Sequence, residues 1–223
     1  LFGERPVFSS DTAIAQVAAG YRASLIDASG RTKLSLDWIL SPGGLVSGND
    51  DADFANARAF ADSSYQYGRL LVERNQRLPL GFALRLRAGG QLATGNLLRS
   101  EQFSLGGATT VRGFAESAAD GDHGWLASAE LVAPAIAPLE LCGVPAVSDE
   151  LRLLAFIDGG AVASADRLPG EASSRQLASV GVGLRYALGS HLSVRFDYGW
   201  QLVSDNVFDP HDSRAHLAVF LSY

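Results

Sequence analysis

Apolar and polar residues alternate along several segments of the chain. From Leu192 to Leu202 the even positions are large and apolar, whereas the odd positions are small or polar. Segments 31–40, 80–88 and 177–186 repeat this alternation. Successive side chains of a β-strand point to opposite faces, so a period of two predicts strands with one apolar and one polar face. Residues 12–25 alternate in the same way, and weaker patterns predict further strands near residues 64–74, 126–133, 151–162 and 215–223.

The composition suits such a protein and excludes other classes. Of the 223 residues, 24 are glycine and 8 are proline, too many for a helical bundle. The formal net charge of −6 argues against nucleic-acid binding, which needs an excess of basic residues to neutralise phosphates. The single cysteine, Cys142, excludes an internal disulfide framework. Prolines and Glu140 interrupt the most apolar stretch, residues 131–147, so we expect no membrane-spanning helix.

Two architectures are compatible with this alternation of apolar and polar residues. In a soluble β-sandwich the apolar faces form the core, whereas in an outer-membrane barrel they contact lipid and the charged faces line the lumen. The links between the predicted strands alternate between short turns and long polar loops, with 135–149 as the exception. Membrane barrels have short periplasmic turns and longer external loops. The pattern therefore favours an all-β fold, a transmembrane antiparallel β-barrel.

The same loop pattern predicts an orientation. If the short turns are periplasmic, the C-terminal Tyr223 is periplasmic and residue 1 is external. Bacterial barrels of this kind have an even number of strands, so roughly nine strands that start outside indicate missing earlier strands. Residues 1–223 are therefore predicted to be the C-terminal part of an outer-membrane barrel domain.

The long segment between the predicted strands at 80–88 and 126–133 carries an unusual set of motifs. It contains, in order, Gly106-Gly107, Val111-Arg112-Gly113-Phe114 and Gly121-Asp122. The next two strands add Glu130 and then Phe156-Ile157-Asp158-Gly159-Gly160. This ordered set resembles the TpsB-type transporters of two-partner secretion, the haemolysin-activator or ShlB/FhaC/HecB family, within the superfamily of BamA-type outer-membrane barrels. The resemblance covers roughly the last 120 residues by motif and roughly the first 90 by strand pattern alone.

The charges in this set can also be interpreted from physical chemistry alone. A guanidinium inside a barrel needs a carboxylate partner, because an unpaired buried charge is costly. Glu130 and Asp158 occupy positions of neighbouring strands whose side chains point to the lumen, and Arg112 lies on a loop long enough to reach both. An arginine can donate forked hydrogen bonds to one or both carboxylates. The alternative is that Arg112 is a solvated loop charge.

The resemblance implies a fold and a site. The fold is a barrel of about sixteen strands, of which this chain supplies about nine, with the long loop folded inward. Residues 111–114 dock in the barrel against Asp158 and Glu130, and Tyr223 ends the signal that the barrel-assembly machinery recognises. The residues expected to support the motif are Phe156, Gly160, Gly106, Gly107, Gly121 and Asp122. The family also carries periplasmic POTRA domains, which are not visible in this sequence.

The function implied by the resemblance is export of a large haemolysin- or adhesin-type partner protein across the outer membrane of a Gram-negative bacterium, without nucleotide. The partner would cross unfolded, and outer-membrane lipid would surround the barrel. No enzyme activity, cofactor, metal or nucleic acid is expected. The alternatives are a BamA-type insertase, which shares the loop, and a passive outer-membrane pore, which would not need a docked arginine. The passive pore is the alternative from another class, and a soluble β-domain that binds a ligand is a further one.

Other groups of residues could carry chemistry, but each has a simpler interpretation. Asp209, His211 and Asp212 could form a hydrolytic dyad or a metal site, yet they lie in a long polar loop where such residues are usually solvated. The acidic run at 49–53 lacks the glycine and the terminal glutamate of an EF-hand loop, and we expect a solvated loop there. Cys142 has no nearby His or Arg to activate its thiol.

Overall fold

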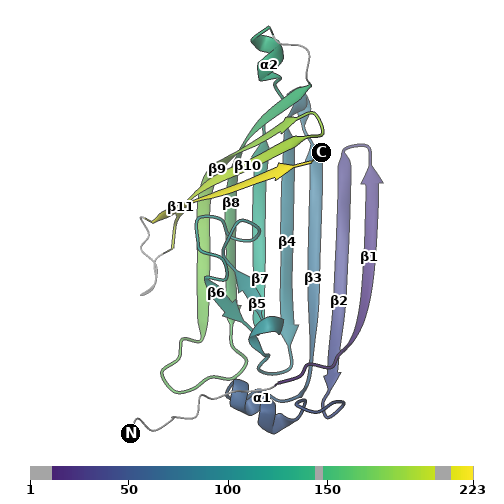
Figure 1. The fold of residues 1–223 in the computed structure, drawn as a ribbon, viewed down its shortest axis with the longest axis vertical. Helices are drawn as coiled ribbons and strands as arrows, with labels where there is room; N and C mark the ends of the chain where they lie inside the picture. The colour runs from purple at the N-terminus through teal and green to yellow at the C-terminus, as the bar shows by residue number, and fades with distance from the viewer. Residues whose placement is uncertain (1–11, 144–147, 204–211, 223) are drawn as a thin grey trace.

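The computed structural model describes residues 12–143, 148–203 and 212–222. Nine strands form one antiparallel sheet, in which each strand pairs with the next along the chain once β5 and β6 are set aside (Figure 1). They are β1 (Val17–Asp27), β2 (Gly30–Pro42), β3 (Ser64–Arg77), β4 (Ala83–Ala93), β7 (His123–Val132), β8 (Asp149–Ala163), β9 (Ser174–Leu188), β10 (Leu192–Gln201) and β11 (Ser213–Leu221). This sheet confirms the predicted all-β antiparallel fold. The sheet is open, with β1 and β11 as its edges among the described residues.

The links between strands follow the predicted alternation of lengths. Short turns join β1 to β2, β3 to β4 and β9 to β10 at one end of the sheet (Figure 1). The long loops lie at the other end, and they carry α1 (Asp51–Ala57) and the small hairpin of β5 (Phe103–Leu105) and β6 (Ala119–Gly121). The exceptional link between β7 and β8 carries α2 (Pro138–Leu141) at the short-turn end. Within the described ranges, no helix has the length and apolar character needed to cross a membrane.

Two local predictions are wrong. The strand predicted to begin at residue 80 begins at Ala83, because residues 79–81 form a 3₁₀ turn. Pro79 has no N–H to donate to a strand ladder, and Leu80 takes a positive φ of 59° that turns the chain. The acidic run at 49–53 is not a solvated loop, because it starts α1. The Asp50 carboxylate caps this helix by accepting a hydrogen bond from the N–H of Asp53 at 2.9 Å.

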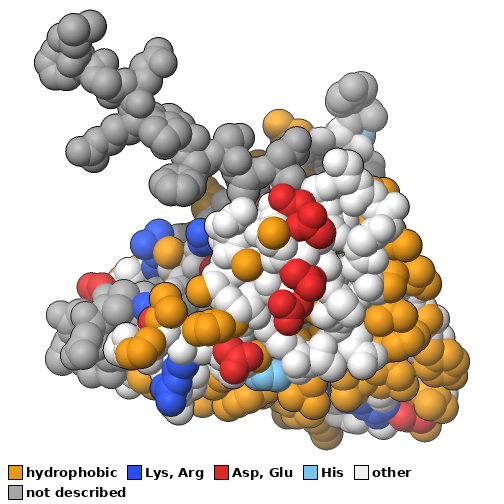
Figure 2. Space-filling model, turned by 90° about the horizontal axis from the view of Figure 1, so that it is seen from below, with side chains coloured by type: hydrophobic (Ala, Val, Ile, Leu, Met, Phe, Trp, Pro, Cys, Tyr) orange, Lys and Arg blue, Asp and Glu red, His pale blue; other side chains and the backbone are white. Residues whose placement is uncertain are grey.

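The two faces of the sheet differ in polarity, as the alternation predicts. On β10, Phe196 and Trp200 are exposed on the outer face, whereas Asp197 and Gln201 are buried on the inner face. The outer face also exposes large apolar side chains on other strands, among them Leu36, Leu70, Leu86, Leu131, Ile157 and Val182. Figure 2, seen from the long-loop end, shows hydrophobic side chains along the rim of the molecule and acidic side chains on the loops. In the described part of the chain no second sheet packs on the outer face, so the core of a soluble sandwich is not formed there.

The long loop between β4 and β7 folds back against the inner face of the sheet. Its β5–β6 hairpin contacts β7, β8 and β9 (Figure 1). The loop and the wall share a buried apolar cluster that contains Leu105, Val111, Phe114, Ala119, Leu126, Val162 and Leu177. Burial of apolar surface contributes about 25 cal/mol per Å², so this cluster favours docking of the loop independently of its charges.

A second apolar cluster packs the long loops against one another. Phe54 of α1 lies against Tyr65 of β3 and against Leu97 and Leu98 of the β4–β7 loop. Phe54 and Leu97 are completely buried. The long loops therefore form a packed cap over one end of the sheet.

Candidate functional site

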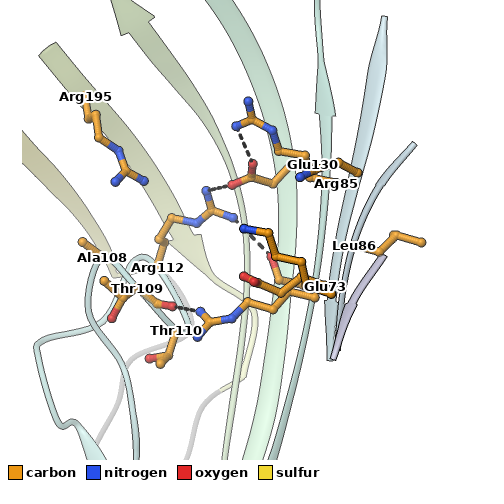
Figure 3. Close-up of a pocket in the computed structure, with 13 residues that line it drawn as sticks. Glu73, Arg85, Leu86, Ala108, Thr109, Thr110, Arg112, Glu130 and Arg195 are labelled. Carbon is orange, nitrogen blue, oxygen red and sulfur yellow. Dashed lines mark hydrogen bonds and ion pairs between the residues drawn. The ribbon is translucent and has the colours of Figure 1, made fainter. Parts of the chain in front are cut away.

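Arg112 lies on the inner face of the sheet at the tip of the inward-folded loop, and its side chain is almost completely buried. Its Nε donates a hydrogen bond to Asp158 Oδ2 at 2.7 Å, and its Nη2 donates to Asp158 Oδ1 at 2.8 Å. Its Nη1 lies 2.5 Å from Glu130 Oε1 (Figure 3). The backbone N–H of Arg112 also donates to Asp158 Oδ2, at 3.1 Å. The structure therefore brings the two acids singled out in the sequence onto one guanidinium, one through a fork and one end-on.

A third carboxylate, Asp197 of β10, completes the acidic surroundings of Arg112. Its Oδ1 lies 3.5 Å from Arg112 Nη1, and it accepts a forked pair of hydrogen bonds from Arg185 at 2.8 and 2.9 Å. Asp197 is one of the polar odd positions of the alternating segment from Leu192 to Leu202, which the barrel interpretation turns toward the lumen, but the pattern did not identify it as a partner of Arg112. Asp197 and Arg195 point to the same face of β10, so the alternation alone could not show which of them contacts Arg112.

Phe156 supports the guanidinium of Arg112 from one side. The Arg112 Cζ lies 3.6 Å from the centre of the Phe156 ring, which is a cation–π contact. A Cβ atom on Gly181 would lie only 2.3 Å from Phe156 Cζ, so only glycine leaves space for the ring. A Cβ on Gly183 would lie 2.3 Å from Asp197 Oδ1. Gly181 and Gly183 of β9 therefore leave room for Phe156 and Asp197, and Arg185 of the same strand orients the Asp197 carboxylate.

Gly113, the next residue of the loop, touches β10 through its backbone. Its N–H donates to His216 Nε2 of β11 at 3.2 Å, and its carbonyl accepts from Gln201 Nε2 at 2.7 Å. Gly113 has a φ of +91°, and a Cβ there would lie 3.0 Å from the carbonyl carbon of Gly199. Sequence analysis missed His216, Gln201 and Gly199, because nothing in the pattern shows where the tip of the loop meets the wall.

The other motif residues have structural positions in the loop and its seat. Val111 and Phe114 are completely buried in the apolar cluster under the loop. A Cβ on Gly160 of β8 would lie 2.8 Å from Leu105 Cδ1, so this glycine makes room for the hairpin. Gly106 and Gly107 both have positive φ values, where the chain leaves β5 toward the tip. Tyr223 lies outside the described residues.

Asp122 joins three long loops in the cap. Its carboxylate pairs with Arg58 at 2.5 and 2.9 Å and accepts the backbone N–H groups of Leu97 and Ala165 at 2.8 and 2.9 Å. Burial by itself would raise the pKa of Asp122, but these partners favour the charged form more strongly, and the pKa of Asp122 lies below its usual value. The neighbouring Gly121 packs against the backbone of Ala163, where a Cβ would approach to 2.8 Å.

The fold and this docked loop define a class of protein. An antiparallel sheet with an apolar outer face, a polar inner face and a loop folded onto that inner face has the architecture of part of a transmembrane β-barrel wall. The chain belongs to the family of haemolysin secretion/activation proteins ShlB/FhaC/HecB, whose model matches residues 6–186. No curated protein matches the chain.

The fold is also found among solved structures. CdiB from Escherichia coli matches with a TM-score of 0.73 and 22% sequence identity over 92% of this chain. The match spans 36% of the CdiB chain, so this chain corresponds to about a third of that protein.

Proposed function

We propose that this protein is an outer-membrane translocator of a Gram-negative bacterium, which exports a large haemolysin- or adhesin-type partner protein through its barrel without nucleotide. Membership of the secretion/activation family and the barrel-type sheet support this proposal. The observation that supports a role of the loop in the lumen is the charge-paired docking of Arg112 on Asp158 and Glu130, because this contact holds a long loop against the face that would line the passage. The family match favours export over the BamA-type insertase, which shares the loop.

The inner face suits the passage of an unfolded chain. It presents both signs of charge, for example Lys33, Asp37, Arg87 and Arg195, so the wall stays hydrated. Mixed charges give an extended polypeptide few continuous apolar surfaces to adhere to. The outer face, by contrast, exposes apolar side chains that suit a lipid environment.

The docked loop is proposed to be the element that adjusts the passage. Its tip is held by ion pairs, by backbone hydrogen bonds and by an apolar cluster, so it has a defined position. The partners proposed for the whole protein are the unfolded passenger, the outer-membrane lipid and, during biogenesis, the barrel-assembly machinery that would recognise the C-terminal strand ending at Tyr223.

The experiment is a secretion assay with the full-length protein and the candidate partner encoded beside its gene. Cells with both proteins should release the partner into the medium, and cells with the partner alone should retain it. Arg112→Ala should lower the released amount while the barrel still reaches the outer membrane. Two results would overturn the proposal. One is retention of the partner at normal barrel levels. The other is a general loss of outer-membrane proteins on deletion of the gene, which would indicate a BamA-type insertase.

A further inference from the structure

A cavity of about 270 Å³ lies on the inner face beside the docked loop (Figure 3). Its basic lining residues are Lys33, Arg85, Arg87, Arg112 and Arg195. These residues come from β2, β4, the loop tip and β10. Lys33, Arg85 and Arg195 lie close to the short-turn ends of their strands, and Arg87 lies slightly farther along β4.

The lining carries more positive than negative charge. Only two acids, Glu73 and Glu130, stand against the five basic residues. Glu130 is already shared by Arg112 at 2.5 Å and Arg85 at 3.6 Å. Glu73 lies directly opposite Lys33 on one neighbouring strand and opposite Arg87 on the other. Arg112 is also paired with Asp158, so the two acids of the lining are shared chiefly by Lys33, Arg85 and Arg87. Neither of them forms an ion pair with Arg195 among the described residues.

Arg195 has the clearest excess of positive charge around it. Its cross-strand neighbours are Arg185 on β9 and Ala218 on β11. Arg185 is engaged with Asp197, and like charges placed directly opposite each other on a sheet are unfavourable. Within the described ranges Arg195 has no acidic partner. An anion beside Arg195 would relieve this repulsion.

Arg87 also has unused hydrogen-bonding capacity next to the loop. Its Nη1 donates to the carbonyl oxygen of Thr109, so it holds the loop tip from β4. Its Nε is buried and has no hydrogen-bond acceptor among the described residues. A buried donor without an acceptor is costly, so the charge of Arg87 is incompletely compensated in this part of the structure.

We propose that this cavity binds carboxylate side chains of the polypeptide that the protein exports, which makes acidic segments the feature of the passenger that the lumen recognises. The inference rests on the proposed function and names the chemistry of its substrate. A carboxylate among Lys33, Arg87 and Arg195 would form charge-assisted hydrogen bonds in a site that is already built. Because Arg87 and Arg112 hold the loop, the passenger would meet the acid-binding cavity and the docked loop together.

Binding is tested with the full-length protein in detergent and a fluorescent hexaglutamate peptide, with hexaserine as the neutral comparison. Fluorescence anisotropy should show binding of hexaglutamate but not of hexaserine. The double variant Lys33→Gln/Arg195→Gln should weaken this binding about tenfold, as expected for two partly exposed ion pairs. The matched control is Arg31→Gln/Arg152→Gln, which removes two positive charges from the same face and end without touching the cavity, and it should bind like the wild type.

Several results would overturn the proposal. Equal loss of affinity in both double variants would indicate general charge attraction. Displacement of hexaglutamate by inorganic phosphate at the same total charge would indicate a site for any anion. If the variant Lys33→Gln/Arg195→Gln binds the peptide more weakly but still exports the partner normally, the passenger does not use the cavity. The proposed function can fail separately from this inference, because a wild type that binds hexaglutamate but exports nothing would contradict the proposed function alone.

Discussion

Gly199 of β10 and Gly113 of the loop tip lie in backbone-to-backbone contact on the inner face of the sheet. A Cβ atom on Gly199 would lie 2.7 Å from the Gly113 nitrogen and 2.8 Å from its Cα, so no side chain fits between the two segments. Gln201 and His216 hold the same glycine by hydrogen bonds to its carbonyl and its N–H. The loop tip therefore has a backbone anchor that is separate from the ion pairs of Arg112.

The first prediction concerns this backbone anchor. Gly199→Ala should displace the loop tip, because the neighbouring atoms are backbone and cannot move aside easily; overpacking of this kind typically costs about 1–3 kcal/mol. The measurement is the rate of maleimide labelling at Thr110→Cys in a Cys142→Ser background, since the native thiol is exposed. Labelling should become faster.

The matched control for this prediction lies in the same long loop. Gly95 has open space around its Cβ position, so Gly95→Ala should leave the labelling rate unchanged. Equal labelling rates in the wild type and Gly199→Ala would show that the contact does not hold the tip.

The second prediction separates charge from geometry at Arg112. Removing one partner of a buried ion pair typically costs about 3–5 kcal/mol, because the other partner stays charged and buried. Arg112→Ala should therefore loosen the loop and impair export while the barrel still assembles. Arg112→Lys should rescue poorly, since an ammonium cannot donate the planar fork that Asp158 accepts.

The control for Arg112 is Arg99→Ala. Arg99 belongs to the same loop and has an acidic partner, Asp120, at 3.5 Å, but its side chain is 82% exposed. An exposed pair of this kind contributes little, so this variant should export normally. Full export by Arg112→Ala at normal barrel levels would contradict the proposed role of the docked arginine.

The third prediction ranks the acids around Arg112. Asp158→Asn should disturb the loop more than Asp197→Asn, because Asp158 accepts three hydrogen bonds from Arg112 and Asp197 lies at 3.5 Å. Asp197→Asn should act mainly through Arg185, whose forked bonds it weakens. Loop labelling at residue 110 gives the order, and the reverse order would assign the main anchor to Asp197.

The strands and the faces of this fold were predictable because they depend only on local geometry. A period of two places Glu130 and Asp158 on one face whatever the rest of the chain does. The contacts of Gly199, His216 and Asp197 with the loop were not predictable. They depend on where a loop of roughly thirty residues lands in space, which is set by the curvature of the sheet and by packing under the tip.

The role of Asp122 shows the same limit over a longer distance. Its motif was recognised in the sequence, but its ion-pair partner Arg58 is 64 residues away on a different loop. Nothing in the local pattern around Arg58 distinguishes it from a solvated charge. The start of β4 was mispredicted for another reason, because Leu80 continues the apolar alternation although Pro79 has already ended the ladder.

The fourth prediction follows from the pKa of Asp122. Because its pKa is lower in the folded protein than in the unfolded chain, the carboxylate stabilises the cap above its ordinary pKa of about 4, and this contribution is lost as the pH falls through the lower folded value. At pH 7 the long loops of the wild type should resist proteolysis better than the long loops of Asp122→Asn. The difference should shrink below about pH 4. A difference that is constant from pH 7 to pH 3 would assign the effect to something other than the charge.

The fifth prediction concerns the outer face. Ile157 lies in the middle of β8, and 56% of its surface is exposed on the apolar side of the sheet. If this side contacts lipid, Ile157→Arg should destabilise the folded protein by about 2–4 kcal/mol, because a charge at that depth leaves water for hydrocarbon. Urea unfolding of the full-length protein in lipid vesicles, followed by tryptophan fluorescence, measures the change.

Leu80→Arg is the control, since Leu80 is 88% exposed on a short turn outside the strands and should tolerate the charge. Equal stability of the two variants would show that the outer face at Ile157 meets water instead of lipid.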